Sequence, residues 1–305
     1  MSPKPSEAIR TIRVAANGLT FSVDECGEGD RLALCLHGFP ESSFSYRYQL
    51  PLLARLGYRA WAPDMRGYGE SSRPRGVSAY TVSKLREDVA GLIDASRAKS
   101  VLLIGHDWGG GVAWSTAIQH TRPIERLIIM NAPHPMSFMR NLFRPAQLLK
   151  SYYIGVFQLP WLPEALLRAN RAERIAHAFV STAVDKSRFP EAVTEVYRKN
   201  ALIPGALTAM LNYYRAMPLA FLDPSNWRTP VLDTPTLLIW GEEDAALTKQ
   251  IALDTRHYVK DLTLRFLPGV SHWVQQEAPE QVNDLIESWL TTPQTSQPAA
   301  HANLV

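Results

Sequence analysis

The segment Gly105-His106-Asp107-Trp108-Gly109-Gly110 constrains the fold of this chain more than any other part of the sequence. It directly follows the apolar run 101–104, and a stretch that favours a helix, 111–119, comes after it. Glycines on both sides of Asp107 predict a strand-to-helix turn too tight for side chains at the flanking positions. Such a turn, a nucleophile elbow, usually presents a serine, whereas here it presents a carboxylate. The alternative is that Asp107 only caps the N-terminus of a helix.

A carboxylate nucleophile narrows the chemistry. It attacks an electrophilic sp3 carbon and leaves an alkyl ester, so epoxide opening and halide displacement are the indicated reactions. Hydrolysis of that ester needs an acid and a histidine later in the chain, in this order. Asp244 and His272, each after an apolar run, are the candidates. Taken singly, the first could be a solvated acidic loop and the second a surface or packing histidine.

The expected oxyanion hole comes from a loop after the apolar run 31–36. The loop reads His37-Gly38-Phe39-Pro40, and its glycine lets the backbone pass close to a site. We expect the backbone N–H groups of Phe39 and Trp108 to point at the carbonyl oxygen of an Asp107 ester.

The composition is that of a globular enzyme. Of 305 residues, 46% are hydrophobic and 20% charged, and the net charge of +3 is spread without a basic block, so no nucleic-acid surface is indicated. Cys26 and Cys35 lie in apolar surroundings, which favours reduced thiols and a cytoplasmic location. We expect no metal, no signal peptide and no membrane span. The end of the chain, 293–305, is predicted to be a disordered tail.

Short apolar runs alternate with helix-patterned segments, which predicts an α/β fold with a mostly parallel central sheet flanked by helices. A hairpin is expected first, and the strands are predicted at 12–16, 19–24, 31–36, 59–62, 100–104, 126–131, 236–240 and 263–267. Helices are predicted at 81–96, 110–119 and 279–290.

The pattern changes between Pro133 and about Pro230, where the sequence is helical, aromatic, rich in arginine and interrupted by prolines. We therefore expect a helical lid, 134–229, inserted after the sixth strand. It would divide the core into 1–133 and 230–292 and cover the carboxyl ends of the strands, where open α/β sheets place their sites.

Three motifs together resemble a known family. HGFPES at 37–42, DMRGYGES at 64–71 and GHDWGG at 105–110 look like soluble, bacterial-type epoxide hydrolases of the α/β-hydrolase superfamily. The resemblance covers residues 12 to 292, without sign of an additional N-terminal phosphatase domain. GHDWGG alone would also suit haloalkane dehalogenases.

The resemblance implies two lid tyrosines that bind the epoxide oxygen. Tyr153 and Tyr214 match these positions, although each has a neighbour, Tyr152 or Tyr213, that could take its place. The alternative is that they are packing residues of the lid with satisfied hydroxyl groups.

The resemblance implies an epoxide hydrolase that makes a vicinal diol, with Asp107 as nucleophile and His272, oriented by Asp244, as the base that activates water. It requires no cofactor. Monomer and homodimer are both ordinary states, and detoxification is one possible role. We expect an apolar substrate pocket; its predicted contacts are Phe39, Trp108, Phe157, Met217 and Trp273, with Leu159 and Trp161 as further apolar lid residues.

Two alternatives are weighed against this interpretation. A haloalkane or haloacid dehalogenase would use the same triad, but Phe39 has no side-chain donor for a halide, and the arginines of fluoroacetate dehalogenases are missing at the elbow. A receptor that only binds would be indifferent to Asp107→Asn. Among the other polar residues, we expect His106 to pack away from the site, Glu41 to lie near the water, and His134 to be a hinge of the lid.

Overall fold

One mixed sheet forms the centre of the molecule. The computed structural model describes residues 8–220, 222–223 and 230–292. The eight strands have the spatial order β1-β2-β4-β3-β5-β6-β7-β8. β1 pairs with β2, and β2 with β4, in antiparallel fashion, whereas all other pairs are parallel. The strands are β1 (Arg10–Ala16), β2 (Leu19–Cys26), β3 (Arg31–Leu36), β4 (Arg59–Pro63), β5 (Ser100–His106), β6 (Arg126–Met130), β7 (Thr236–Gly241) and β8 (Leu262–Leu267).

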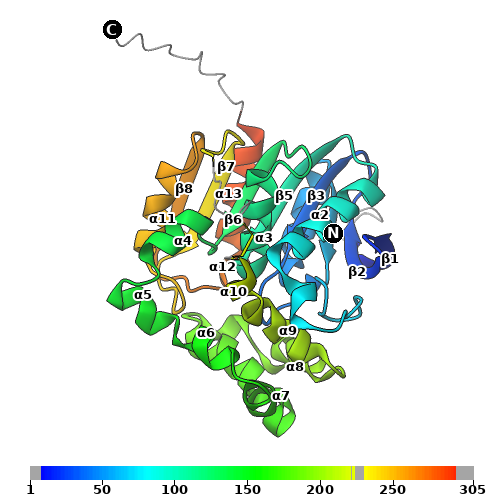
Figure 1. Ribbon diagram of the computed structural model, residues 1–305. Coiled ribbons are helices and arrows are strands. Elements are labelled where there is room, and N and C mark those ends of the chain that lie inside the picture. Colours follow the sequence, from blue (N-terminus) through cyan, green and yellow to red (C-terminus); the bar gives the residue numbers. More distant parts are fainter. Residues whose placement is uncertain (1–7, 221, 224–229, 293–305) are drawn as a thin grey trace.

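Helices cover both faces of this sheet (Figure 1). Those outside the segment between β6 and β7 are α1 (Gln49–Arg55), α2 (Val82–Ser96), α3 (Asp107–Ile118), α11 (Lys249–Asp254), α12 (Val274–Glu277) and α13 (Pro279–Thr291). Short 3-10 turns add η2 (Ser43–Tyr46), η3 (Val77–Tyr80) and η6 (Thr255–His257). The predicted α/β architecture is confirmed, and the three predicted helices correspond to α2, α3 and α13.

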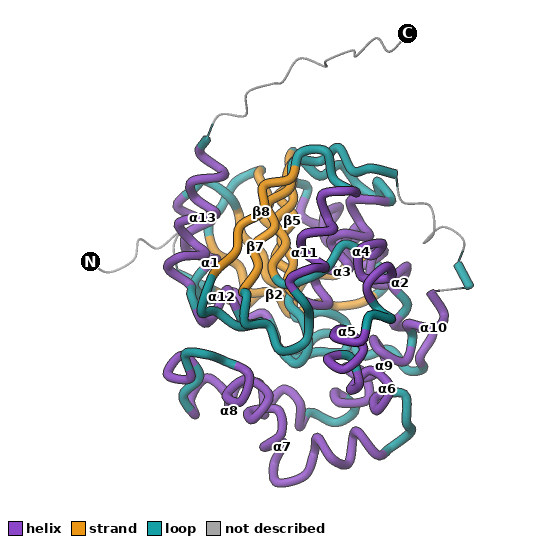
Figure 2. The backbone as a smooth tube through the Cα atoms, turned by 90° about the vertical axis from the view of Figure 1, so that its left-hand side faces the viewer, coloured by secondary structure: helices purple, strands orange, loops and turns teal. Residues whose placement is uncertain are grey.

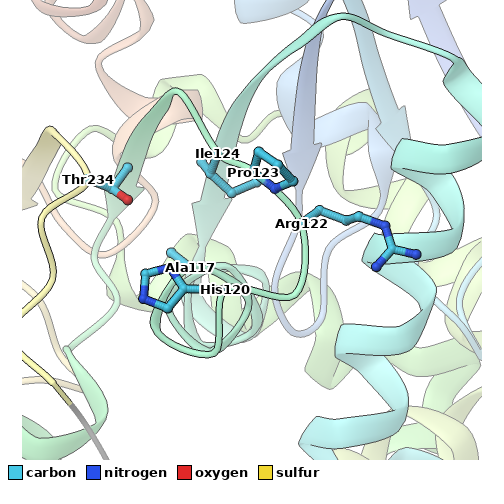
Figure 3. A pocket seen from close by; sticks show the side chains of 6 residues that line it. All are labelled: Ala117, His120, Arg122, Pro123, Ile124 and Thr234. Carbon is cyan, nitrogen blue, oxygen red and sulfur yellow. The ribbon is translucent and has the colours of Figure 1, made fainter.

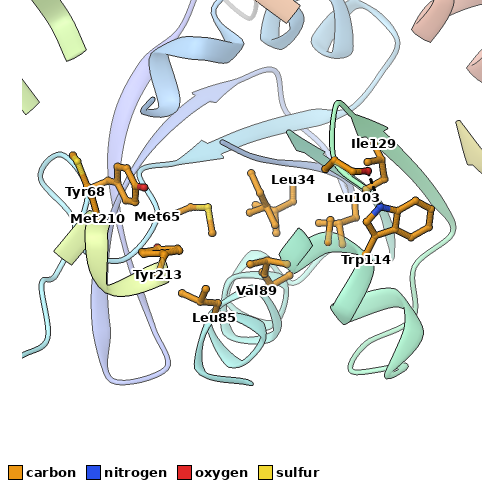
Figure 4. Packing of buried hydrophobic residues seen from close by; sticks show 14 of the residues in the cluster. Leu34, Met65, Tyr68, Leu85, Val89, Leu103, Trp114, Ile129, Met210 and Tyr213 are labelled. Carbon is orange, nitrogen blue, oxygen red and sulfur yellow. Dashed lines mark hydrogen bonds between the residues drawn. The ribbon is translucent and has the colours of Figure 1, made fainter. Parts of the chain in front are cut away.

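The central strands read as continuous apolar runs because both of their faces are buried. Along β3, Leu32, Leu34 and Leu36 pack on the side of α2 and α3, while Ala33 and Cys35 pack on the side of α1 and α13. This is the alternation of side chains along a strand. Figure 4 shows the first layer, where Leu34, Leu103 and Ile129 of the sheet meet Leu85 and Val89 of α2 and Trp114 of α3. Both cysteines are buried and are not joined by a disulfide.

The described part of the segment between β6 and β7 contains helices and no strand. The helices are α4 (Pro135–Asn141), α5 (Pro145–Lys150), α6 (Tyr152–Phe157), α7 (Leu162–Thr182), α8 (Glu191–Leu202), α9 (Ala206–Arg215) and α10 (Met217–Ala220), with the 3-10 turn η4 (Lys186–Arg188). We call them the cap helices. Figures 1 and 2 both place α6 to α9 at one end of the molecule.

Contacts show which end of the sheet this is. The Tyr213 hydroxyl, on α9, donates a hydrogen bond to the carbonyl of Arg66, which follows β4. The backbone N–H of Val184, just after α7, donates to the carboxylate of Glu277, which follows β8. The cap helices therefore lie over the carboxyl ends of the strands. That they form a separate lid with the boundaries 134–229 remains a prediction, since residues 221 and 224–229 lie outside the described residues, as does the predicted tail. Among the described helices, none is long and apolar enough to cross a membrane.

Candidate active site

The predicted sharp turn lies between β5 and α3. Asp107 is the first residue of α3 and has a φ of +49°, a conformation that side chains rarely adopt. The glycines allow the chain to pass: a Cβ at Gly109 would lie 2.0 Å from the Leu36 carbonyl oxygen, and one at Gly110 would lie 2.2 Å from the Cβ of Ala132. The motif therefore brings the start of α3 against the end of β3.

Three side chains that follow three different strands meet at this turn. His272 Nδ1 lies 2.7 Å from Asp244 Oδ2, and His272 Nε2 lies 3.6 Å from Asp107 Oδ2. Asp107 follows β5, Asp244 follows β7 and His272 follows β8, so all three belong to the carboxyl edge of the sheet. This geometry fits the predicted roles of Asp107 as nucleophile, His272 as base and Asp244 as the group that orients the base.

Both carboxylate oxygens of Asp244 accept hydrogen bonds. Its Oδ2 also accepts a hydrogen bond from Asn131 Nδ2 at 2.7 Å, and its Oδ1 accepts from the backbone N–H groups of Ala246 and Leu247 at 2.7 and 2.9 Å. Burial alone would raise the pKa of Asp244, but the charge of His272 and these hydrogen bonds hold it below 3.8. Sequence reasoning missed Asn131, although it stands directly after β6, where such a partner is placed.

His272 sits between two carboxylates. Burial would lower the pKa of its imidazole, yet the charge of Asp244, followed by interactions with Asp107, raises it well above 6.5. Nδ1 faces Asp244 and is therefore fixed, which leaves Nε2 as the nitrogen that faces Asp107.

Of the two amides expected in the oxyanion hole, that of Phe39 donates to Asp107 Oδ1 at 2.7 Å. Gly38 makes this approach possible, because a Cβ there would lie 2.4 Å from the Cβ of Asp107. The amide of Trp108 is the next along the chain after Asp107. The indole ring of Trp108 is perpendicular to the ring of Tyr214, with centroids 5.1 Å apart.

In each pair of adjacent tyrosines, the structure places only one ring at the cavity. Tyr153 and Tyr214 have ring centroids 5.9 Å apart and face the same space as Asp107. Tyr152, in contrast, is 73% exposed, and the Tyr213 hydroxyl donates to the Arg66 carbonyl at 2.8 Å. Burial first, and then the charge of Asp107 among other neighbours, raises the pKa values of Tyr153 and Tyr214 above 10.0, so both phenols are neutral around pH 7.

A cavity of about 170 Å³ lies over Asp107. Its wall is mostly apolar and is formed by Asp107, Trp108, Gly111, Pro133, Pro135, Phe138, Tyr153, Ile154, Tyr214, Met217 and Leu247. Phe39 and Phe157 stand at the edge of this group, with ring centroids 5.4 and 5.0 Å from that of Tyr214. A larger hollow of about 290 Å³ lies elsewhere, where α3 ends and before β6 and β7 begin, and Figure 3 shows its six lining residues. It is remote from Asp107.

Comparison with known proteins agrees with this geometry. A family model described as alpha/beta hydrolase fold matches residues 34–279. The AB hydrolase superfamily protein YfhM of Bacillus subtilis is 40% identical over 288 residues, which cover 91% of this chain and 96% of that protein. Epoxide hydrolase 4 of Homo sapiens is 39% identical over 290 residues, covering 92% and 78%. A crystal structure of an epoxide hydrolase from Bacillus megaterium in complex with an inhibitor superposes with a TM-score of 0.84 at 28% identity, covering 92% and 100%.

The chain belongs to the epoxide hydrolases of the alpha/beta hydrolase fold. As a member of this family it is a hydrolase. Among its described residues, no group of three or more His, Cys, Asp or Glu side chains is arranged to hold a metal ion.

In this epoxide hydrolase family member, a buried network lies behind the elbow. Glu41 Oε2 accepts from the Gly38 amide at 2.9 Å and lies 2.7 Å from His106 Nδ1, while His106 Nε2 lies 2.8 Å from the His272 carbonyl oxygen. His106 is not among the residues that line the cavity, in line with the expectation that it packs away from the site. It is nevertheless more than a packing residue, because it joins the loop of Phe39 to the loop of His272.

Several expected pocket and lid residues lie elsewhere. Trp273 packs against Phe179, with ring centroids 4.4 Å apart, and is not among the residues that line the cavity. Leu159 and Trp161 are 45% and 82% exposed, so they do not form a pocket wall. Both follow α6 at the outer turn into α7, a position that apolar character alone does not reveal.

Proposed function

We propose that this enzyme converts an apolar epoxide to a vicinal diol through an ester between Asp107 and the substrate. The observation that supports this most strongly is that the carboxylate of Asp107 and the rings of Tyr153 and Tyr214 line one apolar cavity. A carboxylate suits attack on carbon, and two neutral phenols suit an oxygen that becomes negative. Relatives such as epoxide hydrolase 4 carry the same activity in their names.

In the first step, an oxygen of Asp107 attacks the less hindered epoxide carbon in line with the breaking C–O bond. Oδ1 is held by the Phe39 amide, so Oδ2 is the free nucleophile. The ring oxygen leaves as an alkoxide and takes a proton from one of the two tyrosines. Their raised pKa values keep this proton in place until the ring opens.

In the second step, water attacks Cγ of the Asp107 ester. Esterification removes the negative charge of Asp107, so the pKa of His272 falls and its imidazolium releases a proton to solvent, which it regains when the charge of Asp107 returns. Nε2 then becomes able to accept a proton from the attacking water. The Phe39 amide, with that of Trp108, binds the oxyanion. The tetrahedral intermediate collapses, the diol oxygen takes the proton from His272, and the remaining proton of the water restores the tyrosine.

Halide displacement is the competing reaction for the same triad. A dehalogenase would hold the departing halide with the Trp108 N–H and a second side-chain donor, and the Phe39 ring offers no such donor. The missing second donor favours the epoxide over a haloalkane.

A two-armed turnover assay tests the proposal. The purified protein is given aryl and alkyl epoxides in one arm and haloalkanes or fluoroacetate in the other, and diol and halide are quantified. We expect diol without halide, loss of at least about 10³-fold in rate for Asp107→Asn, and a covalent adduct of substrate mass in His272→Gln. Halide without diol would refute the proposal, as would full diol turnover by Asp107→Asn.

A further inference from the structure

The carboxylate of Glu277 joins the end of a cap helix to the loop that carries His272. Its Oε1 accepts hydrogen bonds from the backbone N–H groups of Val184 and Asp185 at 2.9 and 2.8 Å, just after α7. Its Oε2 accepts from the backbone N–H of Ser271 at 3.1 Å and from the Ser271 hydroxyl. Ser271 immediately precedes His272. The Glu277 side chain therefore binds two segments, and Val184, in the first of them, is 93 residues away from Glu277 in the sequence.

The residue after His272 binds the same cap segment. Trp273 Nε1 donates to Thr182 Oγ1 at 2.8 Å, and its ring lies 4.4 Å from that of Phe179, both on α7. The two neighbours of His272 are thus both linked to the end of α7, Ser271 through Glu277 and Trp273 directly. A shift of α7 would be transmitted directly to His272, whereas Asp107 is positioned by β5 and by the Phe39 loop, which meet the His272 loop through the hydrogen bond of His106 to the His272 carbonyl.

The chemistry of these contacts requires a carboxylate. Glu277 is 4% exposed, and among the described residues no side-chain cation pairs with it. Four N–H and O–H donors satisfy its two oxygens, which is the acceptor capacity of an ionised carboxyl group. A glutamine of the same shape would turn an NH₂ group toward one pair of these donors, so only one of the two segments would remain bound.

We infer that Glu277 is a positioning residue that couples the cap helices to the base of the hydrolytic step. This inference rests on the proposed function, because it assigns Glu277 to one of its two steps. His272 acts only on the ester, so a loosened His272 slows hydrolysis of the ester and leaves its formation nearly unchanged. Hydrolysis then limits turnover, and kcat and KM fall together while kcat/KM stays constant.

The test compares Glu277→Gln with a matched control, Glu280→Gln. Glu280 also binds the segment after α7, through Arg188 at 3.0 Å, but this ion pair is exposed and should contribute little. Rapid quench with intact-protein mass measurement separates ester formation from hydrolysis. For Glu277→Gln we expect hydrolysis to slow by about ten- to a hundredfold, as a misplacement of about 1 Å can do, with ester formation within about threefold. Glu280→Gln should match the wild type in both steps.

Other outcomes overturn the inference. If both steps slow equally, so that kcat and kcat/KM fall at constant KM, Glu277 is only structural; if neither step changes, the coupling does not exist. Should Glu277→Gln fail to fold, Ser271→Ala removes one contact on the His272 side and should slow hydrolysis selectively by a smaller factor. A wild type that forms no diol would instead refute the proposed function, which keeps the two failures distinct.

Discussion

At the scale of single residues, the tyrosine pairs show how much one position matters. Neighbouring residues of an α-helix point in directions about 100° apart, so only one member of each pair can face Asp107. In α6 this is Tyr153, since Tyr152 is exposed; in α9 it is Tyr214, since the Tyr213 hydroxyl is bound to the Arg66 carbonyl.

Phenylalanine substitutions test this assignment. Tyr153→Phe and Tyr214→Phe should each slow ester formation by about 10–10²-fold, because the opening ring loses a proton donor. Tyr152→Phe should be silent. Tyr213→Phe should leave the rate within about threefold but cost about 1–3 kcal/mol of stability, because a buried carbonyl loses its partner. Rapid-quench rates and urea denaturation measure both effects; an equal loss of rate in Tyr152→Phe would reverse the assignment.

At the scale of elements, the start of α4 is fixed by a buried histidine. His134 precedes α4, its Nδ1 accepts the Met136 amide at 3.3 Å, and its ring stacks on Tyr258 with centroids 4.8 Å apart. These contacts are those of a packed helix cap, and the predicted hinge role remains untested. Burial lowers the pKa of His134 from 6.5 to about 4.

The pKa of His134 predicts an acid-sensitive helix start. As the pH falls below 6.5, His134 becomes protonated in the unfolded chain but stays neutral in the folded chain. The free energy of unfolding is therefore highest above pH 6.5 and decreases until the pH reaches about 4. The full loss is about 3 kcal/mol. His134→Asn keeps a cap acceptor without a titrating group. Urea denaturation at pH 7, 5.5 and 4 should show wild type losing this amount relative to the variant, whereas a pH-independent difference would contradict the prediction.

At the scale of the whole molecule, the site exists because parallel strands end at one edge. β5, β6, β7 and β8 are successive neighbours in the sheet, so Asp107, Asn131, Asp244 and His272 meet although the sequence separates them widely. The cavity closes only when the cap helices supply Tyr153 and Tyr214 from above. The spacing between the layers is set by glycines such as Gly109, which lets α3 touch β3.

A pair of glycine substitutions in α3 tests this spacing. A Cβ at Gly109 would meet the backbone oxygen of Leu36 at 2.0 Å, and backbone cannot rotate away, so Gly109→Ala should destabilise the protein by about 1–3 kcal/mol. A Cβ at Gly111, in the same helix, would have nothing within 4 Å, so Gly111→Ala should be neutral or stabilising by up to about 1 kcal/mol. Denaturant titrations compare them, and equal stabilities would mean that the contact does not set the spacing.

The architecture and the triad candidates could be read from the sequence because they depend on local properties. Apolar runs bounded by glycine mark buried strands, the glycines around Asp107 mark a turn that only they permit, and residues that follow parallel strands share one edge. Asp107, Asp244 and His272 were identified in this way, and the structure places them within reach of one another.

Helix rotation and long-range contacts were decided only by the tertiary structure. Periodicity did not tell Tyr153 from Tyr152, nor show that Trp161 is exposed and that Trp273 faces α7. It also gave no sign of the hydrogen bonds made by the side chains of Asn131 and Glu277. The partners of the Asn131 side chain lie 110 or more residues away, and those of the Glu277 side chain, apart from Ser271, lie 92 or more residues away. The sequence does not show whether the hydrogen-bond partner of a side-chain amide or carboxylate is solvent or a buried backbone group. The packing of segments that are distant in the sequence determines that partner.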